Sequence, residues 1–96
     1  MKSYKRITAV QVSFRILDFL KVQDGPVSGA EVAQGLELPH ATVMSHLTTL
    51  EEINVVRCSG GNYEVGFKMA TFWIEAKKHL EAQRAEIDHK LKLINL

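Results

Sequence analysis

The chain has 96 residues, 46% of them hydrophobic and 24% charged, a composition that fits one small globular domain and excludes a disordered or fibrous protein. Its single cysteine, Cys58, excludes an internal disulfide and a cysteine-based zinc site. The longest stretch of apolar and small residues, Met69 to Ile74, is far shorter than the roughly 20 residues of a membrane helix, and polar residues interrupt the N-terminus where a signal peptide is apolar. We therefore expect an intracellular protein without a membrane segment.

The net charge of +1 conceals an uneven distribution. Five basic residues and one acidic residue give residues 1–23 a charge of +4, whereas one basic and six acidic residues give residues 24–66 a charge of −5. Six basic and four acidic residues leave residues 67–96 at +2. A basic N-terminal arm is suited to phosphate contacts, and a solubilising tail explains it equally well.

The first predicted helix covers about residues 9–22. Its apolar residues recur at spacings of three and four, so they share one helix face that we expect to be buried. They are Val10, Phe14, Ile16, Leu17 and Leu20. Thr8 is the expected N-cap, and Asp24-Gly25-Pro26 ends the helix.

Two further helices are predicted before residue 54. Ser28 and Glu31 have the spacing of a capping box, which places the start of a short helix after Ser28. Pro39 ends the loop that follows and begins a third helix, which runs to about Ile53. Asn54 after it tolerates the left-handed conformation of a helix C-terminus.

The third helix has two distinct faces. Its inward face carries Val43, Leu47 and Leu50, with Ile53 nearby. The opposite face is small and mostly hydroxyl-bearing, and it centres on Ala41, Ser45, Thr48 and Glu52, flanked by Thr42, Met44 and Thr49.

Two short β-prone runs, residues 55–58 and 63–65, surround the turn Ser59-Gly60-Gly61-Asn62 and predict a hairpin. A helix from Phe67 to about Ile94 follows, and its 28 residues would span about 42 Å. The fold class is therefore mainly α with a small two-stranded β wing, a winged helix-turn-helix followed by a long C-terminal helix. We divide the chain into residues 1–66, the winged domain with its basic arm, and residues 67–96.

The long helix predicts a homodimer. Its apolar residues repeat at seven-residue intervals, and Leu91 widens the strip they form. We expect residues 67–74 to pack on the core of the same chain, whereas nothing in the chain is left to cover the strip beyond Lys77. The candidate dimer residues are Trp73, Leu80, Ile87, Leu91 and Ile94.

Several segments match one known family in unbroken register. They are Val10-Gln11, Glu31-Val32-Ala33-Gln34, Leu38-Pro39-His40-Ala41-Thr42-Val43, Leu47-Thr48-Thr49-Leu50-Glu51 and Val55-Val56-Arg57. Over Ile7 to Ile74, the chain resembles the N-terminal DNA-binding domain of IclR-type bacterial regulators. The resemblance implies a cytoplasmic protein of bacterial, archaeal or phage origin.

Some positions depart from the family pattern. Ser45 stands where an arginine is common, and Glu37 and Asn54 stand where the family has glycine. Family members carry an effector-binding domain after the linker helix, and this sequence stops there. We therefore expect no small-molecule effector domain.

The resemblance implies a sequence-specific regulator of transcription that binds double-stranded DNA as a homodimer, with the third helix (about residues 39–53) in the major groove. The candidate base-reading residues are His40, Ala41, Thr42, Ser45 and Thr49. The candidate phosphate-binding residues are Lys2, Lys5, Arg6, Arg15, Arg57 and Asn62.

The alternative is a winged helix that binds protein, as an adaptor or an inhibitor of a larger complex. The acidic centre and the lack of lysine and arginine on the third helix favour that alternative, while the basic arm and the hydroxyl face favour DNA. We expect no enzymatic activity, metal or cofactor, because Cys58 has no recognisable base beside it and the histidines lack metal-ligand spacing. The histidines are His40, His46, His79 and His89, and His46 is expected to be a partly buried structural residue.

Overall fold

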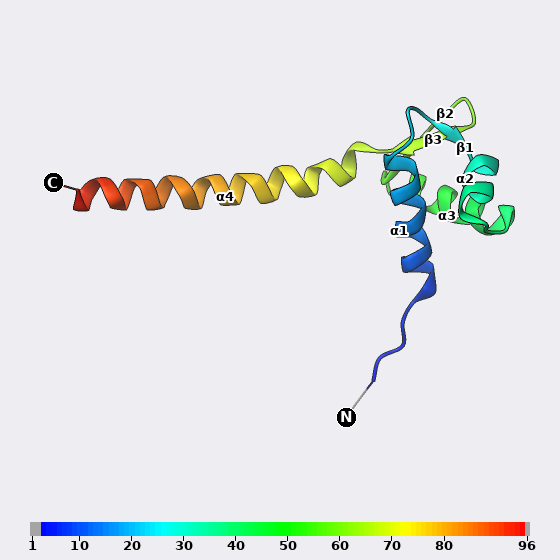
Figure 1. Ribbon diagram of the computed structural model, residues 1–96, viewed down its shortest axis with the longest axis horizontal. Coiled ribbons are helices and arrows are strands. Elements are labelled where there is room, and N and C mark those ends of the chain that lie inside the picture. Colours follow the sequence, from blue (N-terminus) through cyan, green and yellow to red (C-terminus); the bar gives the residue numbers. More distant parts are fainter. Residues whose placement is uncertain (1–2, 96) are drawn as a thin grey trace.

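The computed structural model describes residues 3–95 and has the predicted winged helix-turn-helix fold, with a long helix leaving it (Figure 1). In chain order the elements are α1 (Thr8–Lys21), β1 (Val27–Ser28), α2 (Gly29–Leu36), α3 (His40–Glu52), β2 (Val56–Ser59), β3 (Asn62–Val65) and α4 (Phe67–Ile94). We call α1 to β3 the head. The wing has one strand more than expected, since β1 joins the hairpin in the order β1-β3-β2.

The sequence predicted the N-terminal cap of α2 correctly and that of α1 incorrectly. At α2, Ser28 Oγ accepts from the backbone N–H of Glu31 at 3.2 Å, and the Ser28 N–H donates to Glu31 Oε1 at 3.4 Å, which confirms the capping box. At α1 the prediction was wrong. The N-cap is Ile7, which has no side-chain cap, and Thr8 is already helical.

The core lies where α1, α2 and α3 meet the wing. The inward face predicted for α3 is confirmed, and α1 contributes only the second half of its apolar face. Val10 and Phe14 were expected in the core and are instead 53% and 52% exposed, because they face an open groove beside the C-terminal end of α3. The buried apolar residues are Ile16, Leu17, Leu20, Val32, Ala33, Val43, Leu47, Leu50, Val55, Val56 and Tyr63.

Two residues that stand where the resembled family has glycine adopt left-handed backbone. Glu37, at the turn from α2 to α3, has φ 55°, and Asn54, after α3, has φ 64°. The Asn54 conformation was expected, and asparagine tolerates it. For Glu37 the same conformation is strained, since a left-handed backbone costs an ordinary L-residue about 1–2 kcal/mol.

Glu37→Gly is therefore expected to stabilise the protein. Glycine adopts positive φ without that cost, so the free energy of unfolding should rise by about 1 kcal/mol and the Tm by about 4–8 °C in a domain of this size. Thermal unfolding followed by circular dichroism measures both quantities. Glu37→Ala is the matched control, because it removes the same charge but keeps a Cβ. Equal gains from the alanine and glycine variants would contradict the conformational explanation.

The wing is a tight antiparallel sheet. Gly60 and Gly61 have φ of 58° and 79°, the backbone that a two-residue hairpin turn requires. β3 pairs on both sides, with Tyr63 opposite Cys58 on β2 and opposite Val27 on β1. Burial raises the pKa of the Tyr63 phenol, so the ring stays neutral in the core.

The junction to α4 is fixed by backbone contacts. The Gly66 N–H donates to the Val55 carbonyl at 2.8 Å, and a Cβ on Gly66 would lie 2.8 Å from the Asn54 carbonyl oxygen, so only glycine fits there. Lys68 Nζ then donates to the Ile53 carbonyl at 3.1 Å, which ties the first turn of α4 to the end of α3.

Beyond that junction, α4 leaves the head, and none of its described residues is buried (Figure 1). The radius of gyration is 19.7 Å, whereas a compact chain of this length has about 12–13 Å. The expectation that residues 67–74 pack on the core was wrong. Met69 alone of that segment packs against the core, partly buried, and Trp73 is 78% exposed, because the helix axis points away from the head.

Candidate nucleic-acid interface

The outer face of α3 carries the candidate base-reading residues, and it is open. Thr42 is half-buried, and the other four residues, His40, Ala41, Ser45 and Thr49, are exposed. The face rests on a rigid support, since Val43 and Leu47 on the other side of the helix are fully buried. A helix held in this way can insert its outer face into a major groove.

The hydroxyl groups on this face differ in their availability. Thr49 Oγ1 donates to the Ser45 carbonyl at 2.9 Å, so its proton is already used. The side chains of Thr42 and Ser45 make no hydrogen bond within residues 3–95. Both hydroxyls are therefore available to donate to, or accept from, a base edge or a phosphate.

The N-terminus of α3 presents unused backbone donors. Its N-cap is Pro39, which provides no side-chain cap, and the first intrahelical bond runs from the Val43 N–H to the Pro39 carbonyl at 3.1 Å. The amides of the first turn, from His40 to Thr42, precede that bond and have no carbonyl partner in the helix. Together with the positive end of the helix dipole, they suit a phosphate oxygen.

The N-terminus of α1 flanks the same face of α3. Ala9 and Ser13 line a shallow groove of about 230 Å³ together with Ser45, His46 and Thr49. The arm that leads into α1 therefore starts beside the candidate base-reading face, and the arm extends away from the head (Figure 1).

Two candidate phosphate contacts lie on that arm. Lys5 and Arg6 are exposed and form no ion pair within residues 3–95. Lys2 lies outside the described residues.

The remaining candidate phosphate contacts are Arg15 and Arg57, whose side chains have partners within the chain, and Asn62, which is uncharged. Arg15 Nη2 donates to the Leu36 carbonyl at 3.2 Å, at the end of α2, and Arg57 forms an ion pair with Glu64 across the hairpin. Asn62 is exposed and begins β3 directly after the wing turn. The Arg57–Glu64 pair has a sequence signal, because a two-residue turn at 60–61 places these residues opposite each other.

Acidic residues surround the face at both ends of α3. Glu51 and Glu52 lie in its last turn, about 15–18 Å along the helix axis from His40. Glu37 lies in the turn before α3 and is exposed. The negative charge is therefore concentrated away from the middle of the helix, where Ser45 is found.

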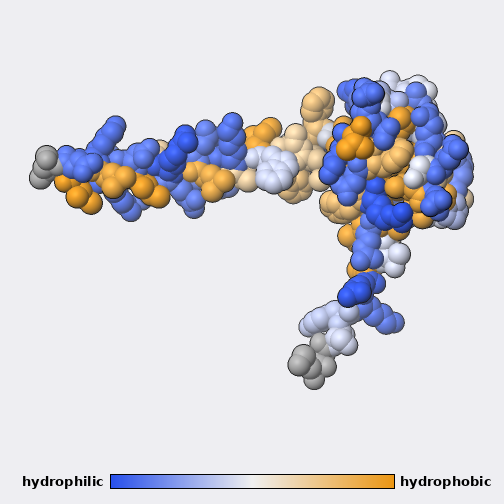
Figure 2. Space-filling view, in the orientation of Figure 1, coloured by the Kyte–Doolittle hydropathy of each residue, from blue (hydrophilic) through white to orange (hydrophobic). Residues whose placement is uncertain are grey.

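The candidate dimer residues lie along one side of α4, and the space-filling view shows groups of apolar side chains on one edge of the helix, with polar side chains between them (Figure 2). Every residue of the strip is more than half exposed, and Trp73 is the most exposed of them. We call this set, Trp73, Leu80, Ile87, Leu91 and Ile94, the α4 strip.

The described residues offer little other chemistry. His46 is partly buried as expected, with Nδ1 2.8 Å from the Thr42 carbonyl oxygen, and its buried Nε2 has no partner within residues 3–95. Over the same residues, no group of three histidine, cysteine or acidic side chains could hold a metal ion. None of the helices described is both long enough and apolar enough to cross a membrane.

Known proteins share this fold and part of this sequence. The family model described as the IclR helix-turn-helix domain matches residues 9–59. The probable transcriptional regulator SauR of Cupriavidus necator is 40% identical over 62 residues, which cover 65% of this chain and 24% of that protein.

Two crystal structures extend the comparison. An IclR family transcriptional regulator from Brucella abortus has a TM-score of 0.66 at 20% identity, over 71% of this chain and 26% of that chain. A transcriptional regulator from Oenococcus oeni has a TM-score of 0.53 at 19% identity, over 100% of this chain and 85% of that chain. The chain thus spans about a quarter of the length of SauR and of the Brucella protein, and the structural likenesses show a shared fold.

Proposed function

Since the chain belongs to the IclR helix-turn-helix family, we propose that it is a DNA-binding regulator of transcription that acts in the cytoplasm. The observation that carries the proposal is the exposed outer face of α3, with the unpartnered hydroxyls of Thr42 and Ser45 and the open helix N-terminus. A helix that reads base edges needs an exposed face with free donors and acceptors, and an open first turn can also hold a phosphate.

We propose further that the protein binds as a homodimer, with α3 of each protomer in the major groove of one half-site. One protomer offers few cations for phosphates, because Arg15 and Arg57 already have intramolecular partners and the centre of the chain is acidic. Two protomers double the contribution of Lys5 and Arg6 on the arms. The α4 strip supplies the surface through which two copies associate.

The rival function is recognition of another protein by the same head. The pairing of Arg57 with Glu64 favours it, because that contact leaves the wing without an unpaired arginine or lysine among the described residues. The open first turn of α3 favours DNA, since its amides suit an anion.

A salt titration separates the two functions. It measures the affinity of the protein for duplex fragments from around its own gene at increasing salt concentration. A dimer that neutralises about four to six phosphates should lose affinity with a slope of about −3.5 to −5.5 in log K against log salt. A nuclease-protection footprint should then show two half-sites about one helical turn apart. The absence of any footprint at low salt would support recognition of a protein instead.

Thr42→Ala with Ser45→Ala tests the assignment of base reading to α3. The double variant should lose discrimination against mismatched operators, about 0.5–1.5 kcal/mol at each base that the hydroxyls contact, because the lost groups read sequence. Nonspecific binding should change little, because neither side chain is charged. Competition with operator and random duplexes measures both. Thr71→Ala on α4 is the control, and an unaltered sequence preference in the double variant would remove α3 from base reading.

A further inference from the structure

The chain passes from α2 into α3 through one left-handed residue, Glu37. The Glu37 N–H donates to the Gln34 carbonyl at 3.3 Å, and the Leu38 N–H donates to the Ala33 carbonyl at 3.0 Å. These two bonds form the Schellman motif, which closes a helix with a left-handed residue. The side chains on either side of Glu37, Leu36 and Leu38, pack against the core. The direction in which α3 leaves α2 therefore depends on the backbone conformation of Glu37.

Arg15 binds the peptide group next to that residue. Its Nη2 donates to the Leu36 carbonyl at 3.2 Å. This carbonyl belongs to the peptide group that joins Leu36 to Glu37, so its direction changes with the φ angle of Glu37. A hydrogen bond from a charged donor is about twice as strong as one between neutral groups, and it can offset the strain of a left-handed glutamate. Arg15 thus stabilises the conformation that Glu37 by itself disfavours.

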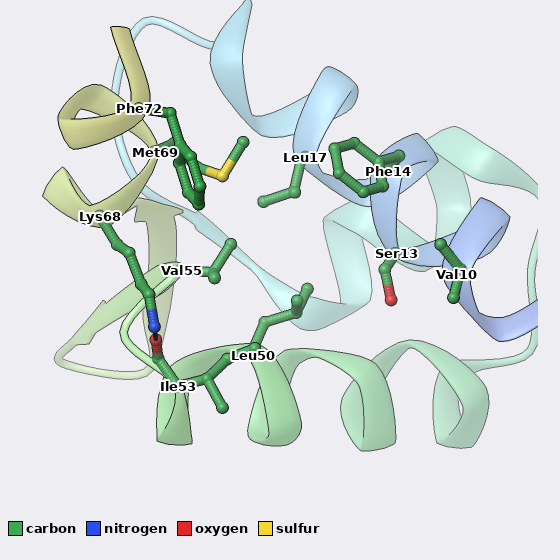
Figure 3. A pocket seen from close by; sticks show the side chains of 10 residues that line it. All are labelled: Val10, Ser13, Phe14, Leu17, Leu50, Ile53, Val55, Lys68, Met69 and Phe72. Atoms are coloured by element: carbon green, nitrogen blue, oxygen red, sulfur yellow. Dashed lines mark hydrogen bonds between the residues drawn. The ribbon is translucent and has the colours of Figure 1, made fainter. Parts of the chain in front are cut away.

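A second contact ties the same face of α1 to the end of α2. Phe19 lies one helical turn after Arg15, so the two side chains share a face of α1. The ring of Phe19 lies directly against the backbone of Gly35 and leaves no room for a Cβ there. Phe14 and Leu17, on another face, line the groove at the C-terminal end of α3 (Figure 3). One face of α1 therefore holds the turn between α2 and α3.

We propose that Arg15 is a positioning residue, which fixes the angle of α3 by holding the peptide group between Leu36 and Glu37. It takes this role in place of the phosphate contact expected from the sequence. The proposal rests on the proposed function and names a residue on which base reading by α3 depends. Reading bases requires α3 at one angle to the groove, whereas attraction to phosphates tolerates several. A turn that samples other conformations lowers the population of protein able to bind an operator.

Arg15→Met in the full chain tests the proposal. Arg15 is exposed, and methionine is a good helix former that removes both the donor and the charge. The ratio of affinities for operator and random duplexes should fall by about 10-fold or more, because each protomer loses the bond that holds its turn. The slope of log K against log salt should stay within about 0.5 of the unmodified value, because no phosphate contact is lost. Competition binding over a salt series measures both, and circular dichroism verifies the fold.

Arg6→Met is the matched control. Arg6 lies on the arm, is exposed and forms no ion pair within residues 3–95. As a phosphate contact it should weaken operator and random duplexes alike, and its loss should make the salt slope shallower by about 1 for each protomer. If Arg15→Met behaves in this way too, Arg15 is a phosphate contact and the proposal is overturned.

A second substitution separates positioning from a general loss of stability. Glu37→Gly added to Arg15→Met should restore most of the lost operator preference, because glycine adopts the left-handed conformation without help. Glu37→Ala removes the same charge, keeps a Cβ and should restore little. Equal rescue by the two substitutions would overturn the proposal, since charge would then explain it.

The remaining outcomes separate this inference from the proposed function. An unchanged affinity ratio in Arg15→Met overturns the role of Arg15 and leaves DNA binding by α3 in place. An unmodified chain that does not prefer an operator to random duplexes overturns both. Should Arg15→Met fail to fold, Arg15→Gln decides, because its shorter amide keeps a polar group at this exposed position and the same two results are expected.

Discussion

Replacing both Leu80 and Ile87 with aspartate is expected to leave the protein monomeric and to lower its affinity for an operator by about 100-fold or more. The two side chains lie one heptad apart at the centre of the α4 strip, so each dimer would have to bury four carboxylates. A monomer keeps half of the phosphate contacts and loses the second half-site. Light scattering and operator titration measure the two effects.

Ala82→Asp with His89→Asp is the matched control. These residues have the same seven-residue spacing on the same helix but lie on the side opposite the strip. The control pair introduces the same charge and should remain dimeric with nearly unchanged DNA affinity. An unchanged dimer in the Leu80 and Ile87 variant would show that the protomers associate elsewhere.

Ser45→Glu is expected to abolish most specific binding while the fold stays intact. Ser45 is exposed at the middle of the outer face of α3, and glutamate is a good helix former there. Its carboxylate would replace a base contact with repulsion from the phosphates, at a cost of roughly 1–3 kcal/mol per protomer, or about 30-fold or more for a dimer. Ser45→Arg should act in the opposite sense, because it adds a cation where the family commonly has one.

Electrophoretic mobility shifts at a fixed salt concentration measure both Ser45 variants. Ala82→Glu on α4 adds the same charge far from the head and should bind like the unmodified chain. Equal loss of affinity in Ser45→Glu and Ala82→Glu would indicate an effect of net charge alone. Equal binding by all three proteins would place the DNA contact on another surface.

Local sequence chemistry predicted the order and type of the main elements. The capping box of Ser28 and Glu31 fixed the start of α2, and the repeating apolar residues of α3 predicted its buried face. The bounds of α4, Phe67 and Ile94, were also predicted, because Gly66 precedes an uninterrupted helical stretch. Signals of this kind act over a few residues of chain, so a linear sequence displays them completely.

The sequence predicted only part of the candidate nucleic-acid interface. Periodicity placed Thr42, Ser45 and Thr49 on the outer face of α3, and the structure adds which of their hydroxyls are unpartnered. The contact of Arg15 with Leu36 joins positions 21 residues apart, which no local pattern predicts. The strand β1 was missed for the same reason, since its two residues form a strand only by pairing with β3.

The amino-acid sequence by itself determined which residues share a helix face, where each helix and the hairpin lie, and that the arm is basic. Only the tertiary structure decided that Val10 and Phe14 stay outside the core and that α4 departs from the head. The physical reason is that hydrophobic periodicity records which side of a helix avoids water, whereas the length over which a neighbour covers that side depends on how the elements pack.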